Sequence, residues 1–262
     1  MSRMQERHSK IIDVLAKNGH VRTAELAKLL ATSRETIRRD LNILAEQGLL
    51  IKSHGGAVLP EKDTPAFVPI KVREKTNFLE KQALCAYAAK AVKEFDTIFL
   101  DTSTTVLPLQ HFIPRNYRLT FISNSIRLIA ELAHLQNPNW TVVALGGIVD
   151  YEIFSSSRYL AMNNLQHFKP NKAFLSCRGI DSDLTVCDTK LDDVEIKSYV
   201  VANCPETYLL ADHSKLGAPG MVKVADAAAF HRIVVTEEAD PLFLSRLTAH
   251  GCQVQIAPPL KR

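Results

Sequence analysis

The sequence predicts an α/β protein of two parts: a small helical module with a hairpin, and a larger domain built on a mostly parallel sheet. The first 60 residues show apolar residues at helical spacing and then two short apolar runs around a Gly-Gly pair. From residue 78 onward, short continuous apolar runs alternate with helical patterns, which is typical of a parallel sheet covered on both faces. Residues 60–77 between them are polar and contain three prolines.

The first module begins with two predicted helices. Residues 3–18 place apolar side chains on one face and end in Asn18-Gly19, a common helix stop. Residues 24–30 form a second, shorter helix, and Thr23 is its N-cap candidate. Only two or three residues separate this helix from the next one, and such a tight joint is typical of a helix-turn-helix.

The third predicted helix, residues 33–48, carries the prediction of function. Thr32 and Ser33 are both suitable N-cap residues, and Glu35 follows Thr32 at the capping-box spacing. Gly48 is placed to end the helix in a left-handed conformation. The apolar residues of this helix form a narrow seam on one side. Arg34, Arg38 and Arg39 lie outside this seam, so the outer face of the helix is basic and could lie in a DNA major groove.

A hairpin completes the first module. Two short apolar runs lie on either side of residues 53–56, Ser-His-Gly-Gly, and a Gly-Gly turn between such runs is typical of paired strands. Three helices followed by a hairpin form a winged helix-turn-helix. The same pattern also fits a small α+β domain with no nucleic-acid partner or a winged helix that binds another protein.

The net charge of +4 is concentrated in this module. Residues 1–60 carry ten Lys and Arg against six Asp and Glu, whereas the remaining residues carry 22 of each sign. A positive excess confined to one small module is a mild electrostatic signature of nucleic-acid binding.

The C-terminal part predicts seven short buried strands, at 97–100, 119–122, 141–145, 173–175, 207–211, 233–236 and 254–256. Helical stretches are expected at 78–95, 125–136, 158–166, 192–203 and 241–250. Continuous apolar strands alternating with helices form a mostly parallel sheet, and ligands bind such sheets at the carboxyl ends of the strands.

Polar or glycine-containing segments follow four of these strands. They are residues 101–105, 123–125, 146–147 and 212–215. Hydroxyls and free backbone N–H groups at the start of a helix suit a phosphate, and a Gly-Gly pair lets backbone approach a ligand closely. Each segment alone could be an ordinary cap or turn. Because all four are expected at one edge of one sheet, together they predict a ligand site.

Composition excludes several other classes of protein. Five scattered cysteines without a C-x-x-C pair indicate free thiols rather than disulfides or a metal site. No apolar run is long enough for a membrane span, and the polar N-terminus argues against a secretory signal. The histidines show no spacing typical of metal ligands. We therefore expect a cytoplasmic protein with no membrane segment, no bound metal and no cofactor.

The first module closely resembles the DeoR/GlpR-type family of bacterial transcriptional regulators. The resemblance is carried by Glu6-Arg7, Glu25-Leu26-Ala27, Thr36-Ile37-Arg38-Arg39-Asp40-Leu41, Gly48 and His54-Gly55-Gly56-Ala57. Thr32 departs from the family pattern, which usually has an apolar residue there. The resemblance implies sequence-specific binding of double-stranded operator DNA.

Positions along the third helix assign roles to its polar residues. Ser33, Arg34 and Glu35 lie at the N-terminal end, which reaches base edges in this kind of docking. Arg34 and Arg38 are expected to read guanine, because a planar guanidinium matches its two acceptors. The predicted DNA-contacting residues, which include two on the wing, are Thr23, Ser33, Arg34, Glu35, Thr36, Arg38, Arg39, Asn42, Lys52 and His54.

Other residues of this helix have more than one possible role. Thr36 and Arg39 are expected to contact phosphate. Arg39 could instead pair with Glu35 four residues earlier. Asp40 is expected to orient an arginine rather than to touch DNA.

The resemblance to this family extends over the second part as well. The family's effector domain looks like a sugar-phosphate isomerase of the ribose-5-phosphate type. Matching segments are Glu80-Lys81, Asp101-Thr102-Ser103-Thr104-Thr105, Ile122-Ser123-Asn124-Ser125, Gly146-Gly147 and Asp212-His213-Ser214-Lys215. Ser103 stands where glycine is usual. With residues 174–182, this variant is similar to the subgroup that regulates the use of fucose-type deoxysugars.

The resemblance implies roles at the strand ends. Ser103, Thr104 and Thr105 would hold a phosphate, and Lys215 would supply positive charge. Lys197 lies where the family often has a basic residue, although it could instead be a solvated surface lysine. Carboxylate and amide side chains would bind sugar hydroxyls. The complete predicted effector set is Asp101, Ser103, Thr104, Thr105, Asn124, Ser125, Gly146, Gly147, Asp181, Lys197, Asp212 and Lys215.

The sequence thus predicts a transcriptional repressor of a carbohydrate catabolic operon, controlled by a phosphorylated sugar and acting as a homodimer or homotetramer. The expected boundaries are 1–59 for the DNA-binding domain, 60–77 for a linker and 78–262 for the sensing and oligomerisation domain. No catalytic residues are expected. The alternative is a sugar-phosphate isomerase or transferase with an appended DNA-binding module, with Asp101, Glu195 or Asp212 as its general base.

Overall fold

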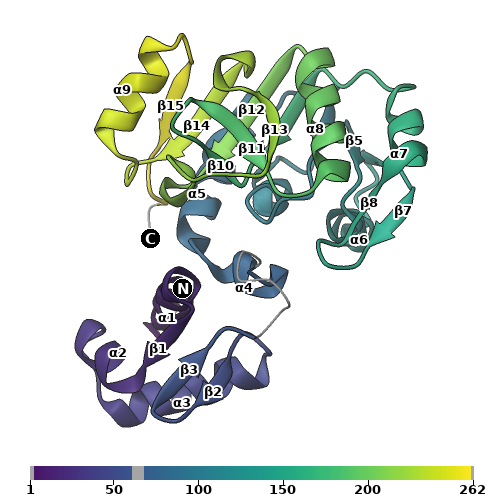
Figure 1. Cartoon of the computed structure of the whole chain (residues 1–262). Coiled ribbons are helices and arrows are strands. Elements are labelled where there is room, and N and C mark those ends of the chain that lie inside the picture. Colours follow the sequence, from purple (N-terminus) through teal and green to yellow (C-terminus); the bar gives the residue numbers. More distant parts are fainter. Residues whose placement is uncertain (1–2, 61–67, 261–262) are drawn as a thin grey trace. The chain divides into compact units, whose positions relative to one another are not determined.

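The computed structural model describes residues 3–60 and 68–260 of the chain (Figure 1). The chain divides into two compact units, Met1–Phe78 and Leu79–Arg262. Residues 61–67, which belong to the predicted linker, lie outside the described residues. No helix within the described ranges is long and apolar enough to cross a membrane.

The first unit is a winged helix-turn-helix followed by one more short helix. Its helices are α1 (Arg3–Asn18), α2 (Thr23–Leu29), α3 (Arg34–Glu46) and α4 (Ile70–Lys75). Its antiparallel sheet has the order β1 (His20–Arg22), β3 (Gly56–Val58) and β2 (Ile51–Ser53). The predicted winged helix is confirmed. It has one additional strand, β1, which was not predicted because a strand of three residues has too short a sequence pattern.

The ends of α2 and α3 differ slightly from the prediction. Ser33, not Thr32, caps α3, and its Oγ accepts a hydrogen bond from Thr36 N at 3.0 Å. The predicted cap of α2 was wrong by one position, because Arg22 precedes the helix and Thr23 is its first residue. The N–H of Thr23 is instead satisfied by Gly55 O at 2.8 Å.

The core of the first unit lies between α1, α3 and the sheet. The predicted seam of α3, formed by Ile37, Leu41 and Leu44, is buried there. Val72 of α4 is fully buried in the same cluster, and α4 packs on α1. The part of the predicted linker that the structure describes therefore includes a helix that belongs to the core of this unit.

The second unit is built on a seven-stranded, fully parallel sheet. Its order is β15-β14-β12-β9-β4-β5-β6. The strands are β4 (Thr97–Leu100), β5 (Leu119–Ser123), β6 (Trp140–Ala144), β9 (Lys172–Leu175), β12 (Glu206–Ala211), β14 (Arg232–Thr236) and β15 (Val254–Ala257). All seven strands were predicted, each to within one residue at either end.

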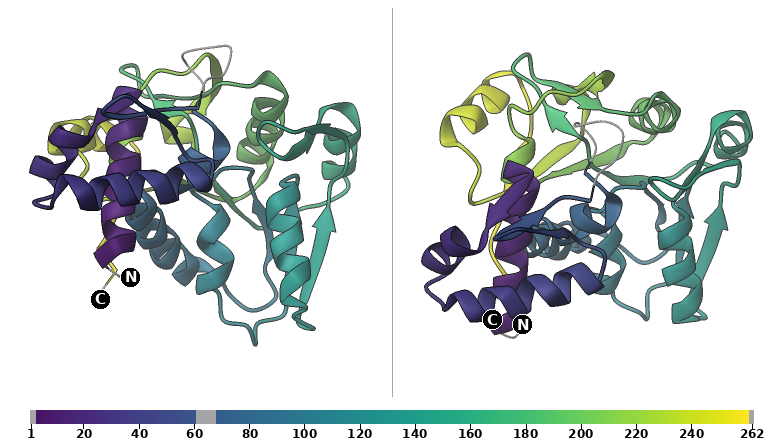
Figure 2. Two further views of the ribbon diagram at one scale, coloured as in Figure 1. Left: turned by 90° about the horizontal axis from the view of Figure 1, so that it is seen from below. Right: turned by 60° about the horizontal axis from the view of Figure 1, so that its bottom comes forward.

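Helices cover both faces of this sheet (Figures 1 and 2). One face packs against α5 (Phe78–Ala88), the 3₁₀-helices η1 (Ala89–Ala91) and η2 (Leu107–Phe112), and α6 (Ile126–Leu135). The other face packs against α7 (Arg158–Leu165), α8 (Leu191–Asn203) and α9 (Pro241–Ala249). Both apolar clusters are buried, as expected for a parallel sheet.

One predicted helix was too long. The helix expected at 78–95 ends at Ala88 as an α-helix and at Ala91 with its 3₁₀ extension. A turn then forms, in which Asp96 Oδ2 accepts a hydrogen bond from Lys93 N at 2.7 Å and Phe95 adopts a left-handed φ of 70°. This side-chain acceptor competes with the helical hydrogen bonds.

The sequence did not predict two smaller sheets. The strands β10 (Gly179–Ile180), β11 (Thr185–Asp188) and β13 (Val222–Asp226) form an antiparallel sheet. The strands β7 (Ile148–Asp150) and β8 (Ser155–Ser157) form a hairpin after β6. β8 consists of three serines, so it lacks the apolar residues that predict a strand.

Candidate functional site

The outer face of α3 is polar, basic and exposed. Arg34, Glu35, Arg38, Arg39 and Asn42 all lie there, opposite the buried seam. These are five of the residues predicted to contact DNA. An exposed, positively charged helix face next to a hairpin has the shape and charge that major-groove binding requires.

Glu35 pairs with both neighbouring arginines. Its carboxylate lies 3.5 Å from Arg38 Nη1 and 3.7 Å from Arg39 Nε. The pair between Arg39 and Glu35, which was the alternative to a phosphate contact, is therefore present in the structure. The pair between Arg38 and Glu35 was not predicted. All three side chains are largely exposed, and pairs of this kind contribute only a few tenths of a kcal/mol, so both arginines can rearrange onto DNA at little cost.

Asp40 anchors α3 to α1. Its carboxylate accepts hydrogen bonds from Arg7 Nε at 2.5 Å and Arg7 Nη2 at 2.9 Å, and it contacts His8 Nε2 at 2.8 Å. Burial acts to raise the pKa of Asp40, but the hydrogen bonds and charges of Arg7 and His8 outweigh it and lower the pKa. Asp40 thus orients an arginine, as expected, and that arginine belongs to another helix.

The other predicted DNA contacts differ in exposure. Lys52 in β2 and His54 in the hairpin turn are exposed, as a wing contact requires. Thr36 is half-buried and its hydroxyl lies 2.8 Å from Ser33 Oγ. Thr23 is only 8% exposed. Their contacts with DNA stay predictions.

In the second unit, Lys197 of α8 is the centre of a buried cluster. Its Nζ lies 2.6 Å from Asp188 Oδ2, 3.0 Å from Asp193 Oδ2 and 3.4 Å from Asp101 Oδ2. It also donates to Ser176 O at 3.2 Å. Burial acts to lower the pKa of Lys197, but the three carboxylates raise it well above the ordinary value. Lys197 is therefore a buried ion-pair residue and not a solvated surface lysine.

Asp101 connects this cluster to the loop between β4 and η2. Its carboxylate accepts hydrogen bonds from Ser103 N at 2.9 Å and Ser176 N at 2.8 Å. Burial raises the pKa of Asp101 despite the opposing charge of Lys197. The neighbouring Thr102 Oγ1 donates to Asp193 Oδ1 at 3.0 Å, so the loop and the first turn of α8 are joined.

The loop after β4 leads into a different element from the one predicted. Residues 101–105 precede the 3₁₀-helix η2, not an α-helix, so a full helix N-terminus is not available to an anion. Ser103 Oγ accepts a hydrogen bond from Val106 N at 3.1 Å, and Thr104 Oγ1 accepts one from Lys81 Nζ at 3.1 Å. Thr105 is fully buried.

Lys215 lies at the same sheet edge, in the segment directly after β12. Its Nζ donates to Ser176 Oγ at 2.8 Å and to Cys177 O at 2.7 Å. Asp212 is buried and caps the short helix η3 (His213–Lys215). Two lysines, Lys81 and Lys215, thus contact hydroxyl groups at this sheet edge, while the carboxylate cluster surrounds Lys197.

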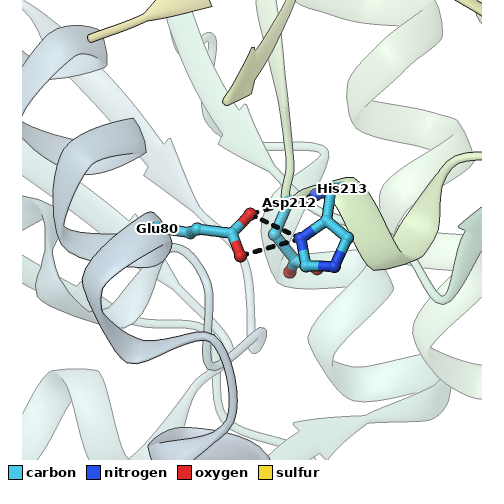
Figure 3. A group of neighbouring side chains, drawn as sticks. All are labelled: Glu80, Asp212 and His213. Carbon is cyan, nitrogen blue, oxygen red and sulfur yellow. Dashed lines mark hydrogen bonds and ion pairs between the residues drawn. The ribbon is translucent and has the colours of Figure 1, made fainter. Parts of the chain in front are cut away.

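Figure 3 shows a further link at this edge, between α5 and the segment after β12. Glu80 contacts His213 Nδ1 at 2.8 and 2.9 Å and accepts a hydrogen bond from Thr236 Oγ1 at 2.7 Å. Ligand atoms of Glu80, Asp212 and His213 lie within 4.8 Å of one another, a spacing that could hold a metal ion. Because Glu80 already joins the segment after β12 to the end of β14, the contacts are those of a structural link.

The remaining predicted effector residues are placed differently. Ser125 caps α6, and its Oγ accepts from Leu128 N at 3.3 Å. Gly146 and Gly147 come after β6 and both have positive φ. Asp181 accepts hydrogen bonds from Asp183 N and Thr185 N within its own turn, both at 2.9 Å. Within the described residues, the hydrogen bonds and ion pairs of Asp181 do not connect it to the Lys197 cluster.

A cavity that the sequence did not predict lies beside this cluster. It has a volume of about 280 Å³ and is lined by residues of the β7–β8 hairpin and the first turn of α8. Ser155, Ser157, Lys190 and Asp193 are among them. The run of three serines at 155–157, directly before a predicted helix, is the sequence signal that could have pointed to it.

The comparisons with known proteins agree with this division into two units. The family model described as the DeoR-like helix-turn-helix domain matches residues 7–63. The model described as the DeoR C terminal sensor domain matches residues 76–237.

Similar proteins cover almost the whole chain. It is 33% identical to the uncharacterized HTH-type transcriptional regulator YulB of Bacillus subtilis (strain 168), over 98% of each chain. It is 27% identical to the glycerol-3-phosphate regulon repressor of Escherichia coli (strain K12), over 96% of this chain and 98% of that one. A ribose 5-phosphate isomerase from Methanocaldococcus jannaschii aligns over 52% of this chain and 53% of its own, with 18% identity and a TM-score of 0.37.

Proposed function

This chain belongs to the DeoR family of HTH-type transcriptional regulators, and on that premise we propose that a phosphorylated sugar, bound at the Lys197 edge of the sheet, controls how tightly α3 holds operator DNA. The observation that supports DNA binding in this proposal is the exposed basic face of α3. That face is fixed in place by the buried contacts of Asp40 with Arg7 and His8.

The proposal that a phosphorylated sugar binds rests on the side chains at the carboxyl ends of the parallel strands. Lys81 and Lys215 supply positive charge next to the hydroxyls of Thr104 and Ser176, which suits a phosphate. The carboxylates around Lys197 are acceptors for sugar hydroxyls. The E. coli relative is named for a glycerol 3-phosphate regulon. A phosphorylated polyol or sugar is therefore the class of effector that we propose for this chain.

We also propose that the protein represses its operon as a homodimer or homotetramer in the cytoplasm, where its operator is. One short recognition helix reads too few bases for specificity. Two copies would read half-sites separated by about one turn of DNA, roughly 34 Å, or a multiple of it. The effector would favour one arrangement of the paired sensor domains and so change operator affinity.

The site is proposed to bind its ligand without turnover. Of the three possible general bases, Asp101 and Asp212 are 2% and 1% exposed and are held in hydrogen bonds of the protein, while Glu195 is exposed on α8. The relatives quoted above are regulators. Conversion of a sugar phosphate by the purified protein would favour the isomerase alternative.

A gel-shift experiment tests the proposal. The probe is the DNA upstream of the protein's own gene, and a shuffled probe of the same composition is the control. We expect a sequence-specific shift at moderate salt, and a change in that shift when a panel of sugar phosphates is added. The panel should include glycerol 3-phosphate and a deoxyhexose phosphate of the fuculose type. Equal binding to both probes would contradict the proposed operator binding, and no response to any sugar phosphate would contradict the proposed effector.

A further inference from the structure

We propose that the cavity between the β7–β8 hairpin and α8 binds the hydroxyl-bearing, uncharged end of the effector, and that the phosphate is bound separately, at the loop after β4. This inference rests on the proposed function and adds an orientation for the ligand. The cavity lies outside the segments that the sequence pointed to, since neither the hairpin nor the start of α8 was among them.

The charge of the cavity wall argues against a phosphate there. Asp150, Asp192 and Asp193 line the cavity, whereas Lys190 is its single ammonium group. Lys190 is also engaged, with Asp150 Oδ2 at 2.5 Å and Glu152 Oε2 at 2.8 Å. Asp192 pairs with Arg158 at 2.8 Å and Asp193 pairs with Lys197 at 3.0 Å, so a dianion would have to displace a carboxylate from one of these cations. Alcohol groups donate hydrogen bonds to carboxylates, so the same wall suits the hydroxyls of a sugar.

Two buried side chains, Ser155 in the cavity wall and Asn124 in the segment paired with β8, have unused hydrogen-bonding capacity. Ser155 and Asn124 are 1% and 0% exposed. Ser155 Oγ and both side-chain polar atoms of Asn124 have no hydrogen-bond partner in the described parts of the chain. A buried polar atom without a partner is costly, so such atoms are expected where a ligand completes them. A ligand hydroxyl, which both donates and accepts, matches the serine in the cavity wall.

These two side chains belong to adjacent backbone segments. Ser156 N donates to Asn124 O at 2.8 Å, and an antiparallel bridge pairs Ser125 with Ser155. The hairpin thus lies directly against the segment between β5 and α6. Asn124, which was predicted to bind the effector, and Ser155, which was not, are brought to one place.

The cavity is also connected to the proposed phosphate loop. Asp193, in the cavity wall, accepts a hydrogen bond from Thr102 Oγ1 at 3.0 Å and forms an ion pair with Lys197. Thr104, two residues further along that loop, contacts Lys81. A ligand with its phosphate at Thr104 and its carbon chain toward Asp193 would therefore span two chemically different ends of one site.

Calorimetric titration of the full-length protein tests this orientation. The probes are inorganic phosphate, glycerol 3-phosphate, ribose 5-phosphate, fructose 1-phosphate and fuculose 1-phosphate. Ser155→Ala should weaken binding of the tightest sugar phosphate by roughly 3- to 10-fold, because one hydrogen bond is lost, and should leave inorganic phosphate unchanged. Ser156→Ala is the matched control, because its hydroxyl already donates to Asn124 O. Thr104→Val should weaken both kinds of probe.

The outcomes separate the inference from the proposed function. If no sugar phosphate binds the wild-type protein, both fail. If sugar phosphates bind and Ser155→Ala binds them like the wild type, the proposed function stands and this orientation is wrong. If Ser155→Ala weakened the binding of inorganic phosphate as much as that of the sugar phosphate, the phosphate would lie in the cavity, and this orientation would also be wrong. Ser155→Thr, which keeps the hydroxyl and adds a methyl group, is a second variant and should weaken fuculose 1-phosphate more than glycerol 3-phosphate.

Discussion

At the scale of single residues, Asp40 shows how a charge inside the recognition helix serves the fold. It is 2% exposed, and its partners are on α1, so it sets the position of α3 without facing DNA. A neutral residue at this position would leave the Arg7 guanidinium without its carboxylate. Breaking an ion pair from one side leaves the other charge without its partner, at a cost that is reduced here because Arg7 is partly solvated.

Asp40→Asn is therefore expected to destabilise the first unit. The loss should be roughly 1–3 kcal/mol of unfolding free energy, since the amide keeps one acceptor but no charge and Arg7 stays partly solvated. Chemical denaturation followed by circular dichroism measures it. Glu35→Gln, on the exposed face of the same helix, is the control and should stay within about 0.5 kcal/mol of the wild type. Equal midpoints for the two variants would contradict the role of Asp40.

His213 gives the molecule a predictable dependence on pH. Partial burial acts to lower its pKa, but the hydrogen bond and charge of Glu80 outweigh that effect and raise the pKa above its ordinary value of 6.5. A raised folded-state pKa means that the folded protein favours the imidazolium. The stabilisation from this link is complete below the unfolded-state pKa and is lost as pH rises through the folded-state pKa.

We expect the thermal midpoint of the second unit to fall as pH rises from about 6 to 8, with His213 contributing to the slope. His213→Gln should reduce that slope, because its amide does not titrate. His134→Gln, on the exposed side of α6, should leave it unchanged. Scanning calorimetry at several pH values provides the measurement, and identical slopes in all three proteins would contradict the assignment.

At the scale of elements, the β7–β8 hairpin depends on one glycine. An added Cβ on Gly147 would lie 2.5 Å from Ser157 O, and the φ of +119° at this residue is one that side chains rarely adopt. Gly146 also has a positive φ, +67°, but a Cβ there would meet nothing within 4 Å. The two neighbouring glycines thus offer a matched pair of positions.

Gly147→Ala should destabilise the protein by about 1–3 kcal/mol more than Gly146→Ala, because strain and a backbone clash add to the shared cost of a left-handed conformation. It should also weaken effector binding, since β8 would have to move away from Gly147. Thermal unfolding and calorimetric titration of both variants test this. A smaller loss for Gly147→Ala than for Gly146→Ala would show that the hairpin adjusts freely.

The elements also show what the sequence could and could not predict. The seven central strands were predicted because continuous apolar runs bounded by polar loops have few other uses. The hairpin strand Ser155–Ser157 could not be predicted this way, because its burial comes from contacts with distant segments. Lys197 entered the predicted site through family resemblance. Asp188 did not, since only the folded chain brings β11 to α8, whereas Asp193 lies four residues before Lys197 on one helix and its spacing alone indicated the pair.

At the scale of the whole molecule, the two units divide the function between them. The net positive charge and the exposed arginines of α3 belong to the first unit, and the Lys197 cluster and the cavity belong to the second. The two activities should therefore be separable by single substitutions, even though regulation requires both units in one chain.

Arg38→Ala and Thr104→Val should separate them. The first should lose roughly 1–3 kcal/mol of specific operator binding while sugar-phosphate binding survives. The second should bind the operator like the wild type and lose the response to sugar phosphate. Gel shifts with and without effector, together with calorimetry, check both variants. Wild-type operator affinity in Arg38→Ala, or an unchanged response in Thr104→Val, would remove that residue from its site.

The start of α5 has a consequence for the energetics of regulation. This helix begins at Phe78, the last residue of the first unit, and its first turn reaches two loops, through Glu80 to His213 and through Lys81 to Thr104. An effector bound at these loops, as proposed, would act on the start of α5. Linkage is reciprocal, so operator DNA would change the affinity for the sugar phosphate by the same factor as the sugar phosphate changes affinity for DNA. Protein bound to its operator and protein free in the cell would then respond at different concentrations of the same metabolite.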